Sequence, residues 1–426
     1  MQYNKEILKS TLFKVTSLNS ISVLLKIGIG LITSKIIAVF VGPNGMALVG
    51  NLRNFLSSIE TVATLGFQNG TVKYVAENKA DNEALKKIIS TVFITLVFTA
   101  LAISLILFFG ADYWNTRLFG SSFQYKAIFK VLALALPWYI VNVLLVSIIN
   151  GLGQFKRVIY IAIFGNLIGL LLSVVLISQF RTFGALLSVV LTPSLLFFVS
   201  FYYINKEYAF LKNITYRSFD SGVIRLMSSY TLMTLVSGFA GPLVYLAIRN
   251  NVIETIGIKE AGYWEAISRI SSYYLMFIGT LLSVYFLPKL VEAQDNTETK
   301  KVFWSYYKTI MPLFGLGLLL VYGLKDFLIT LLFTADFKPV SELFFWQLAG
   351  DFFKGASLIL GMQFFAKKLT RDFIITEITS LLILYVASIY CINAFGVKGV
   401  VIGHTITYFV YLCVLGVYFR KALFAR

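Results

Sequence analysis

The chain has 426 residues, of which 58% are hydrophobic and only 13% are charged, and its mean hydropathy is +0.81. A soluble domain carries about 25% charged residues, so this composition excludes a soluble globular protein and indicates an integral membrane protein. The formal net charge of +17 would suggest a nucleic-acid partner in a soluble protein. In a membrane protein, Lys and Arg instead collect in the cytoplasmic loops, and we expect no nucleic-acid binding.

Twelve segments are apolar enough to cross a bilayer, which takes roughly 20 mostly apolar residues per helix. The first, second, eighth and tenth are the most polar, and a spanning helix with many polar residues is expected to face a cavity rather than lipid. The sequence therefore predicts an all-α integral membrane fold with spans at 12–40, 46–75, 88–110, 126–150, 158–180, 183–204, 222–249, 260–288, 302–324, 340–366, 373–394 and 399–420.

Basic residues are unevenly distributed between the predicted loops. If the N-terminus is cytoplasmic, about 20 Lys and Arg residues, Lys5, Lys9 and Lys14 among them, lie on that side and about 6 on the other, an excess that fixes orientation. We expect both termini in the cytoplasm. The first apolar run lacks a small-residue cleavage site and is interpreted as a retained helix. The loops, about 12–16 residues at their longest, leave no room for a catalytic domain, so no enzyme is expected.

Two short patterns recur about half a chain apart. Phe183-Gly184-Ala185 opens the sixth predicted span and Phe395-Gly396-Val397 opens the twelfth, while basic loops ending at Arg157 and Arg371 precede the fifth and the eleventh. We therefore predict two pseudo-symmetric lobes of six helices, 1–206 and 207–426. Because six is even, the two lobes run in the same direction and are related by an axis along the membrane normal.

Five charged residues lie where the hydrocarbon core of the bilayer is expected. A charge at the centre of a membrane helix costs roughly 2.5–3.5 kcal/mol on insertion scales, so it usually faces a bundle interior or a wet cavity and marks a substrate path. Four of the five are cationic, and the predicted cavity therefore prefers an anion. The five are Lys26, Arg53, Arg269, Asp351 and Lys354.

Several of these charges have a candidate partner, which leaves a structural role open. Glu265 precedes Arg269 by four residues, the favourable order for an ion pair on a helix, and Asp351 and Lys354 are three residues apart. Arg53 and Glu60 share one helix face and line either a cavity or a buried network. We retain as candidates for anion binding Lys26, Lys35, Arg53, Arg249, Arg269 and Lys354, although Lys35 and Arg249 are equally compatible with interfacial anchoring.

Ion coupling requires a group that can take up and release a proton or bind a cation. The candidates are Asp351, Glu60 and Glu265, with Glu377 as a rival. The only histidine, His404, begins the twelfth span and is interpreted as a structural residue. Cys391 and Cys413 have no metal-binding spacing, and the phosphate-binding pattern GxxxxGK[ST] is absent. We expect no metal, no cofactor and no built-in ATPase.

Several stretches resemble the Wzx-type lipid-linked oligosaccharide flippases, the polysaccharide branch of the multidrug/oligosaccharidyl-lipid/polysaccharide (MOP) exporter superfamily, and within it the flippases of the enterobacterial common antigen. The resemblance rests on LKIGIGLITSKIIAVFVGPNGMALVGNLRNF (25–55), FQNGTVKYVAE (67–77), YFLP (285–288), WQLAGDFFK (346–354) and AKKLTRDFIITE (366–377), and it spans nearly the whole chain. Residue types match the family motifs at Lys26, Lys35, Arg53, Lys73, Asp351, Lys354 and Lys367, and Arg249 matches as a basic residue closing the seventh span.

The resemblance implies twelve helices in two lobes that form a V, alternating access, and a place in the bacterial inner membrane. The implied cargo is an undecaprenyl-diphosphate-linked oligosaccharide, a lipid III or O-antigen-type unit, flipped from the cytoplasmic to the periplasmic leaflet by an ion-coupled monomer. Lys26 and Arg53 would hold the diphosphate, since Arg suits bidentate phosphate contact, with Arg269 or Lys354 contributing from the second lobe. Candidate partners are membrane lipids, a glycan polymerase and a chain-length regulator.

Three other functions remain open. A multidrug/cation antiporter of the same superfamily would need an anionic cavity, which the excess of Lys and Arg disfavours. A lipid II flippase would use similar chemistry, but its relatives usually carry two further helices. A membrane glycosyltransferase or polymerase would need a long catalytic loop.

Overall fold

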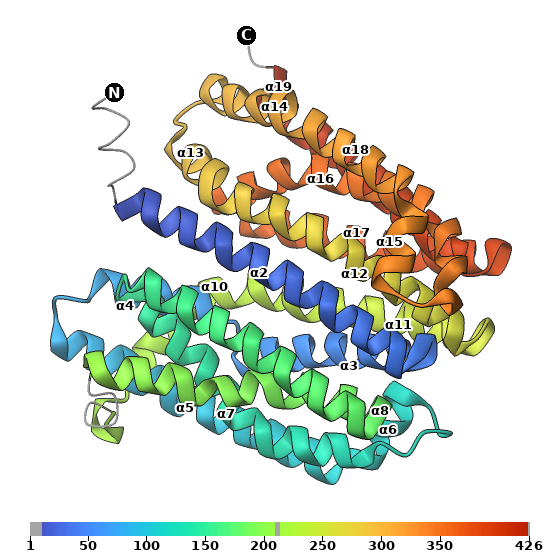
Figure 1. Ribbon diagram of the computed structural model, residues 1–426. Helices are drawn as coiled ribbons and strands as arrows, with labels where there is room; N and C mark the ends of the chain where they lie inside the picture. The colour runs from blue at the N-terminus through green and yellow to red at the C-terminus, as the bar shows by residue number, and fades with distance from the viewer. Residues whose placement is uncertain (1–10, 209–213, 425–426) are drawn as a thin grey trace. The chain divides into compact units, whose positions relative to one another are not determined.

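The computed structural model describes residues 11–208 and 214–424, with the side chains of 11–20, 207–208 and 228–230 left undescribed. In these residues it is helical without a β-strand (Figure 1). Helices suit a chain this apolar, because they satisfy every backbone N–H and C=O internally where no water can do so. The predicted all-α class is confirmed. Lys5 and Lys9, which the predicted orientation uses, lie outside the described residues.

Eight helical stretches in the described part of the chain are long and apolar enough to cross a membrane. A ninth is added if α14 (Asn296–Gly323) and α15 (Lys325–Leu332), which meet at 70°, form one span. This count takes α8 (Phe155–Tyr208) as one stretch, although its backbone leaves helical geometry at Arg181 (φ 51°, ψ −125°). The number of twelve spans therefore stays a prediction.

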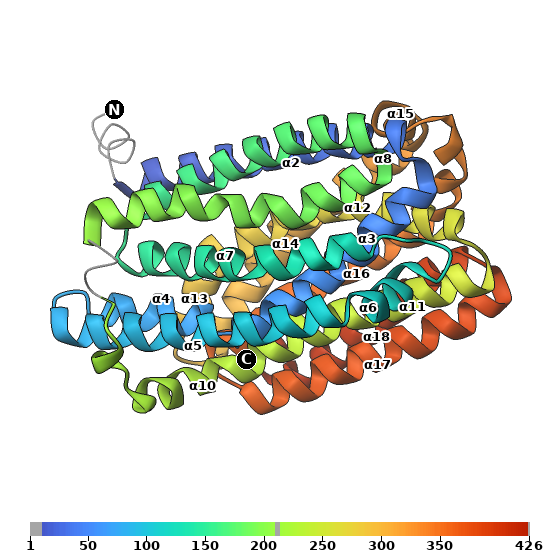
Figure 2. The ribbon, with the colours of Figure 1, turned by 90° about the horizontal axis from the view of Figure 1, so that it is seen from below.

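The first of two compact units consists of Met1–Val41 and Asn51–Phe239. Within it α2 packs along α8, and α7 packs along both α8 and α5; Figure 2 shows α2 and α8 side by side. Its elements are α2 (Thr11–Phe40), most of α3 (Gly42–Ala63), α4 (Gln68–Glu77), α5 (Asn82–Phe109), α6 (Ala111–Phe119), α7 (Lys126–Gly151), α8, the 3₁₀ turn η1 (Tyr216–Ser218), α10 (Ser221–Leu235) and most of the π-helical turn η2 (Val236–Ala240).

The second unit consists of Gly42–Gly50 and Ala240–Arg426. Here α18 packs along both α16 and α17, and α16 also contacts α12 and α14. Its elements after η2 are α11 (Gly241–Thr255), α12 (Ile258–Leu281), the π-helical turn η3 (Leu282–Phe286), α13 (Leu287–Glu292), α14, α15, the 3₁₀ segment η4 (Ala335–Leu343), α16 (Phe344–Ala366), α17 (Thr370–Phe395), α18 (Lys398–Tyr418) and α19 (Arg420–Phe424). Packing defines these units, whereas the predicted lobe boundary at 206/207 concerns a sequence repeat and stays a prediction.

The second predicted span, 46–75, is broken into two helices. α3 ends at Ala63 and α4 begins at Gln68, and between them Leu65 (φ 50°) and Gly66 (φ 64°) have left-handed backbone conformations. Such conformations interrupt a right-handed helix, and glycine adopts them without steric cost. The apolar pattern continues across this turn, so the sequence alone does not show where the predicted span is interrupted.

One turn recurs at half-chain spacing. Gly396, between α17 and α18, has φ 61° and ψ −143°, close to the values at Arg181. Three residues after each turn stands a glycine, Gly184 or Gly399, against which a backbone carbonyl eight residues earlier packs too closely for any Cβ. The two turns lie 215 residues apart, near the spacing that the sequence motifs suggest.

Candidate functional site

The predicted anion-binding residues of the first unit lie on α2 and α3. Lys26 and Arg53 are exposed, and Lys35 is half-buried. Since an exposed charge within a membrane helix is far too costly to face hydrocarbon, it indicates contact with water or with a charged ligand.

Glu60 ends this polar run on α3 and is held by neighbours from other helices of the first unit. The Tyr139 hydroxyl on α7 donates a hydrogen bond to Glu60 Oε2, and Gln68 Nε2 at the start of α4 donates to Oε1 over 3.0 Å. Charged hydrogen bonds of this kind contribute roughly 1.5–3 kcal/mol each. Glu60 thus fastens α3 to α4 and α7, a role that the sequence does not reveal because Tyr139 is distant in the chain.

Three charged residues of the second unit form a buried cluster. Arg249 on α11 and Arg269 on α12 are 2% and 4% exposed, and both donate to Glu265 on α12: Arg249 Nη2 to Oε2 over 2.7 Å and Arg269 Nε to Oε1 over 2.9 Å. The helix spacing of Glu265 and Arg269 correctly predicts their ion pair. Arg249 also lies 4.9 Å from the ring centre of Trp264, a cation–π contact.

The cluster holds more positive charge than it neutralises. Two guanidinium groups share one carboxylate, which leaves a formal charge of +1. Within the described part of the chain, Arg249 Nε and Nη1 and Arg269 Nη2 are buried without a hydrogen-bond partner. Such groups cost roughly 1–3 kcal/mol each unless something accepts from them, and an anion would do so.

Gly50 permits this cluster to form. It lies in the part of α3 that belongs to the second unit, and a Cβ there would overlap the Glu265 carboxylate and come within 2.8 Å of Arg249 Nη1. Only glycine lets the α3 backbone approach the ion pair so closely. Gly50 lies in the stretch 25–55 that carries the family resemblance. The structure shows that a glycine is required at this position for packing, which the sequence alone does not reveal.

Asp351 is fully buried at the centre of a second polar cluster. It accepts hydrogen bonds from Ser271 Oγ (2.5 Å) and the Tyr274 hydroxyl on α12, from Gln347 Nε2 (3.2 Å) on α16, and from His404 Nε2 (3.0 Å) on α18. His404 thus has a partner in Asp351, as a structural histidine would. The sequence missed this cluster because its members come from three helices.

Lys354 is half-buried and does not form a salt bridge with Asp351 within 4.0 Å in the described structure. Its ammonium lies 4.8 Å from the centre of the Tyr408 ring, as a cation–π contact. The pairing of Asp351 with Lys354 that their spacing suggests is therefore replaced by Asp351–His404 and Lys354–Tyr408. The spacing of Asp351 and Lys354 on α16 would also allow them to pair with each other. Each instead contacts a residue of α18, because α18 packs along α16.

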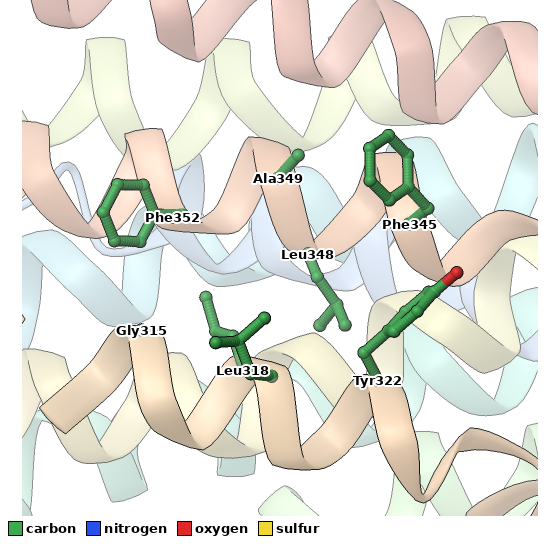
Figure 3. A pocket seen from close by; sticks show the side chains of 8 residues that line it. Gly315, Leu318, Tyr322, Phe345, Leu348, Ala349 and Phe352 are labelled. Atoms are coloured by element: carbon green, nitrogen blue, oxygen red, sulfur yellow. The ribbon is translucent and has the colours of Figure 1, made fainter. Parts of the chain in front are cut away.

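An apolar cavity of about 410 Å³ lies between α14 and α16 (Figure 3). The α16 residues that line it are not those that form the polar contacts of Asp351 and Lys354. Leu318 faces Leu348 across it, and Gly315 and Ala349 provide the space. It contains almost no polar surface, so it is unsuited to a charged headgroup and suited to hydrocarbon. The remaining lining residues are Leu319, Tyr322, Phe345 and Phe352.

Residues 12–294 match the family "Polysaccharide biosynthesis protein". The chain belongs to this family. It is also 29% identical over 401 residues to the lipid III flippase of Escherichia coli (strain K12), which covers 94% of this chain and 96% of that protein.

Solved structures show the same fold. An inward-facing multidrug resistance MATE family transporter of the MOP superfamily superimposes with a TM-score of 0.82, 14% sequence identity, and coverage of 93% of this chain and 94% of that one. The lipid II flippase MurJ in an inward closed conformation gives a TM-score of 0.69 at 16% identity, covering 96% of this chain and 90% of that one. The chain is thus a multi-pass membrane protein with the fold of MOP-superfamily transporters.

Proposed function

We propose that this protein flips an undecaprenyl-diphosphate-linked oligosaccharide, of the lipid III or O-antigen type, from the cytoplasmic to the periplasmic leaflet of a bacterial inner membrane. It does so by alternating access of two lobes of six spans, without hydrolysing a nucleotide. Both termini are cytoplasmic in this proposal. Its likeness to the Escherichia coli lipid III flippase over nearly the full length of both chains supports the cargo class.

The observation that carries the proposal is the pair of exposed cations on α2 and α3 of the first unit. The side chains of Lys26 and Arg53 are exposed, so an anion can reach both. A lipid diphosphate is a dense anion that Arg binds with two parallel hydrogen bonds and Lys as a point charge. We assign both residues to the diphosphate, with Lys35 as a further contact.

The second unit offers its own contacts to an anion. The cluster of Arg249, Glu265 and Arg269 has an excess positive charge and unpaired N–H groups, and Lys354 adds a half-buried ammonium. The apolar cavity between α14 and α16 suits the hydrocarbon tail of the lipid cargo. A cargo with a diphosphate head and a polyprenyl tail accounts for both kinds of surface.

Ion coupling falls to the acidic residues. Glu60 is engaged by Tyr139 and Gln68, and Glu265 neutralises two arginines. Asp351 is the acidic residue that contacts the imidazole of His404. We therefore assign coupling to Asp351 together with its partner His404, and a structural role to Glu60 and Glu265.

A multidrug/cation antiporter is the second candidate, because transporters of the multidrug class share the fold. A site for cationic drugs needs a surplus of carboxylates in the spanning helices. Among the side chains of α2 and α3 that the structure describes, the exposed charges are Lys26 and Arg53, which would repel such a drug. The charge balance favours the anionic cargo.

The test is a flipping assay with the purified chain in vesicles, using undecaprenyl-diphosphate-GlcNAc as cargo and a glycosidase outside to report arrival. K26A and R53A should each lower the initial rate about tenfold or more, the factor expected for loss of one or more charge-assisted hydrogen bonds worth roughly 1.5–3 kcal/mol each. K130A removes an exposed cation from α7 and should leave the rate unchanged. Wild-type rates in both K26A and R53A would refute the assignment of the anion site.

A further inference from the structure

The only histidine of the chain is buried inside the second unit against its most deeply buried carboxylate. His404 on α18 is 6% exposed, Asp351 on α16 is 0% exposed, and His404 Nε2 lies 3.0 Å from Asp351 Oδ1. Burying an ionisable pair costs several kcal/mol per ion before attraction repays it. An ordinary packing contact between α16 and α18 needs no such pair.

The groups around Asp351 match its ionised form. An ionised carboxylate only accepts hydrogen bonds and has about four lone-pair sites. Its partners Ser271, Tyr274, Gln347 and His404 each present a hydrogen to it. Asp351 is thus a permanent anion in this arrangement, and an exchangeable proton belongs elsewhere.

His404 is the place for that proton. His404 Nε2 faces Asp351 Oδ1. Because an ionised carboxylate only accepts hydrogen bonds, Nε2 carries a hydrogen in both protonation states, and Nδ1 gains or loses the second one. Imidazole is the side chain whose charge changes most readily between about pH 5 and 8. When His404 is protonated, the Asp351–His404 pair has no net charge. When His404 is neutral, the pair has the single negative charge of the Asp351 carboxylate.

The other titratable groups near the pair allow both states. On α16, Lys354 interacts with Asp351 and with Tyr408 of α18 and Tyr245 of α11; on α17, Glu377 interacts with Lys354. Tyr274 is the titratable residue that α12 presents. With tyrosines neutral, Asp351, Glu377 and Lys354 leave a formal charge of −1, which one proton on His404 brings to zero. Neither state buries more than one excess charge.

We propose that Asp351 and His404 form a proton-binding site that couples this carrier to a proton gradient, with one proton per cycle on His404 and Asp351 as its fixed counter-charge. The coupling rests on the proposed flippase function, whereas the binding of the proton does not. A metal cation is the other ligand of a buried carboxylate, but it requires several oxygen ligands. Imidazole and amide N–H groups occupy two of the contacts here.

The proton site is tested by nuclear magnetic resonance of the full-length chain in nanodiscs, with ring-labelled histidine. Because the sequence has one histidine, one signal reports it, and H404Q should remove that signal. We expect a reversible one-proton transition between about pH 5 and 8. D351N removes the counter-charge and should reduce the protonated fraction at pH 6 about tenfold or more; S271A should have a smaller effect in the same direction. A signal invariant from pH 5 to 9, or a titration unaffected by both D351N and S271A, would overturn the proposal.

Coupling is tested in vesicles that contain a pH-sensitive dye, with undecaprenyl-diphosphate-GlcNAc as cargo. H404Q retains an N–H donor for Asp351 but cannot take up a proton. It should bind the lipid as wild type does and lose cargo-dependent proton movement. Proton movement that persists in H404Q, or transport that follows sodium instead of pH, would overturn the coupling. A wild-type chain that neither binds nor moves the lipid, but whose histidine titrates with Asp351, would refute the flippase function and leave the proton site standing.

Discussion

In the first unit Lys26 on α2 and Arg53 on α3 are exposed, whereas in the second unit Arg249 and Arg269 are buried against Glu265. The two arrangements have opposite energetics. A buried, shared carboxylate ties α11 to α12 and becomes costly to remove, because unpaired charges would stay inside. Replacing an exposed cation should change the free energy of unfolding only slightly.

This difference separates structural from functional charge. Replacing a buried charge of the Arg249–Glu265–Arg269 cluster should impair folding. Replacing an exposed cation, Lys26 or Arg53, should impair cargo binding and leave folding intact. The Asp351–His404 pair is buried like the arginine cluster, and we propose above that it is functional as well.

Replacing Glu265 should produce the largest loss of stability. E265Q keeps the side-chain shape but leaves two buried guanidinium charges without a counter-charge, and removing one partner of a buried pair costs roughly 3–5 kcal/mol. Thermal unfolding of the purified chain in detergent measures the effect. E254Q, on an exposed acidic residue of α11, is the control and should remain within about 0.5 kcal/mol of wild type. Equal unfolding temperatures for E265Q and wild type would show that the cluster does not hold the second unit together.

Enlarging Gly50 should disturb the same cluster from the side of α3. G50V places atoms where the Glu265 carboxylate and Arg249 Nη1 lie, and overpacking of this kind costs typically about 1–3 kcal/mol. G28A on α2, where a Cβ meets nothing within 4 Å, should have no such effect. If G50V and G28A unfold at the same temperature, α3 does not pack against the cluster as described.

The sequence predicted the parts of this structure that depend on local pattern. Apolar runs located most spanning helices, and the spacing of Glu265 and Arg269 predicted their ion pair. The pattern failed at Leu65 and Gly66, where a left-handed turn interrupts an apolar run without changing its hydropathy. A turn of this kind depends on backbone conformation, which composition does not record.

The polar clusters could not be predicted because they join distant segments. Asp351 and Lys354 were expected to interact, yet Asp351 binds His404, 53 residues further on, and Ser271, 80 residues before it. The sequence contained one usable signal: a single histidine in an otherwise apolar helix requires a buried hydrogen-bond partner. It did not say which residue that partner would be.

The smallest effect is expected at an exposed ion pair of the first unit. Lys73 and Glu77 lie 3.8 Å apart on α4, with 37% and 54% of their side chains exposed. Exposed pairs contribute roughly 0–1 kcal/mol, so K73A should change the free energy of unfolding by less than about 0.5 kcal/mol. A loss larger than 2 kcal/mol would show that exposure does not separate structural from functional charge in this chain.

The central claim is that Lys26 and Arg53 bind the diphosphate of the lipid cargo, and equilibrium binding tests it most directly. The full-length chain in nanodiscs is titrated with undecaprenyl diphosphate and with undecaprenyl alcohol, which has the same tail and no phosphate. We expect wild type to prefer the diphosphate. The doubly substituted chain, K26A with R53A, should lose this preference at least tenfold while unfolding at the wild-type temperature. An unchanged preference in the doubly substituted chain would contradict it.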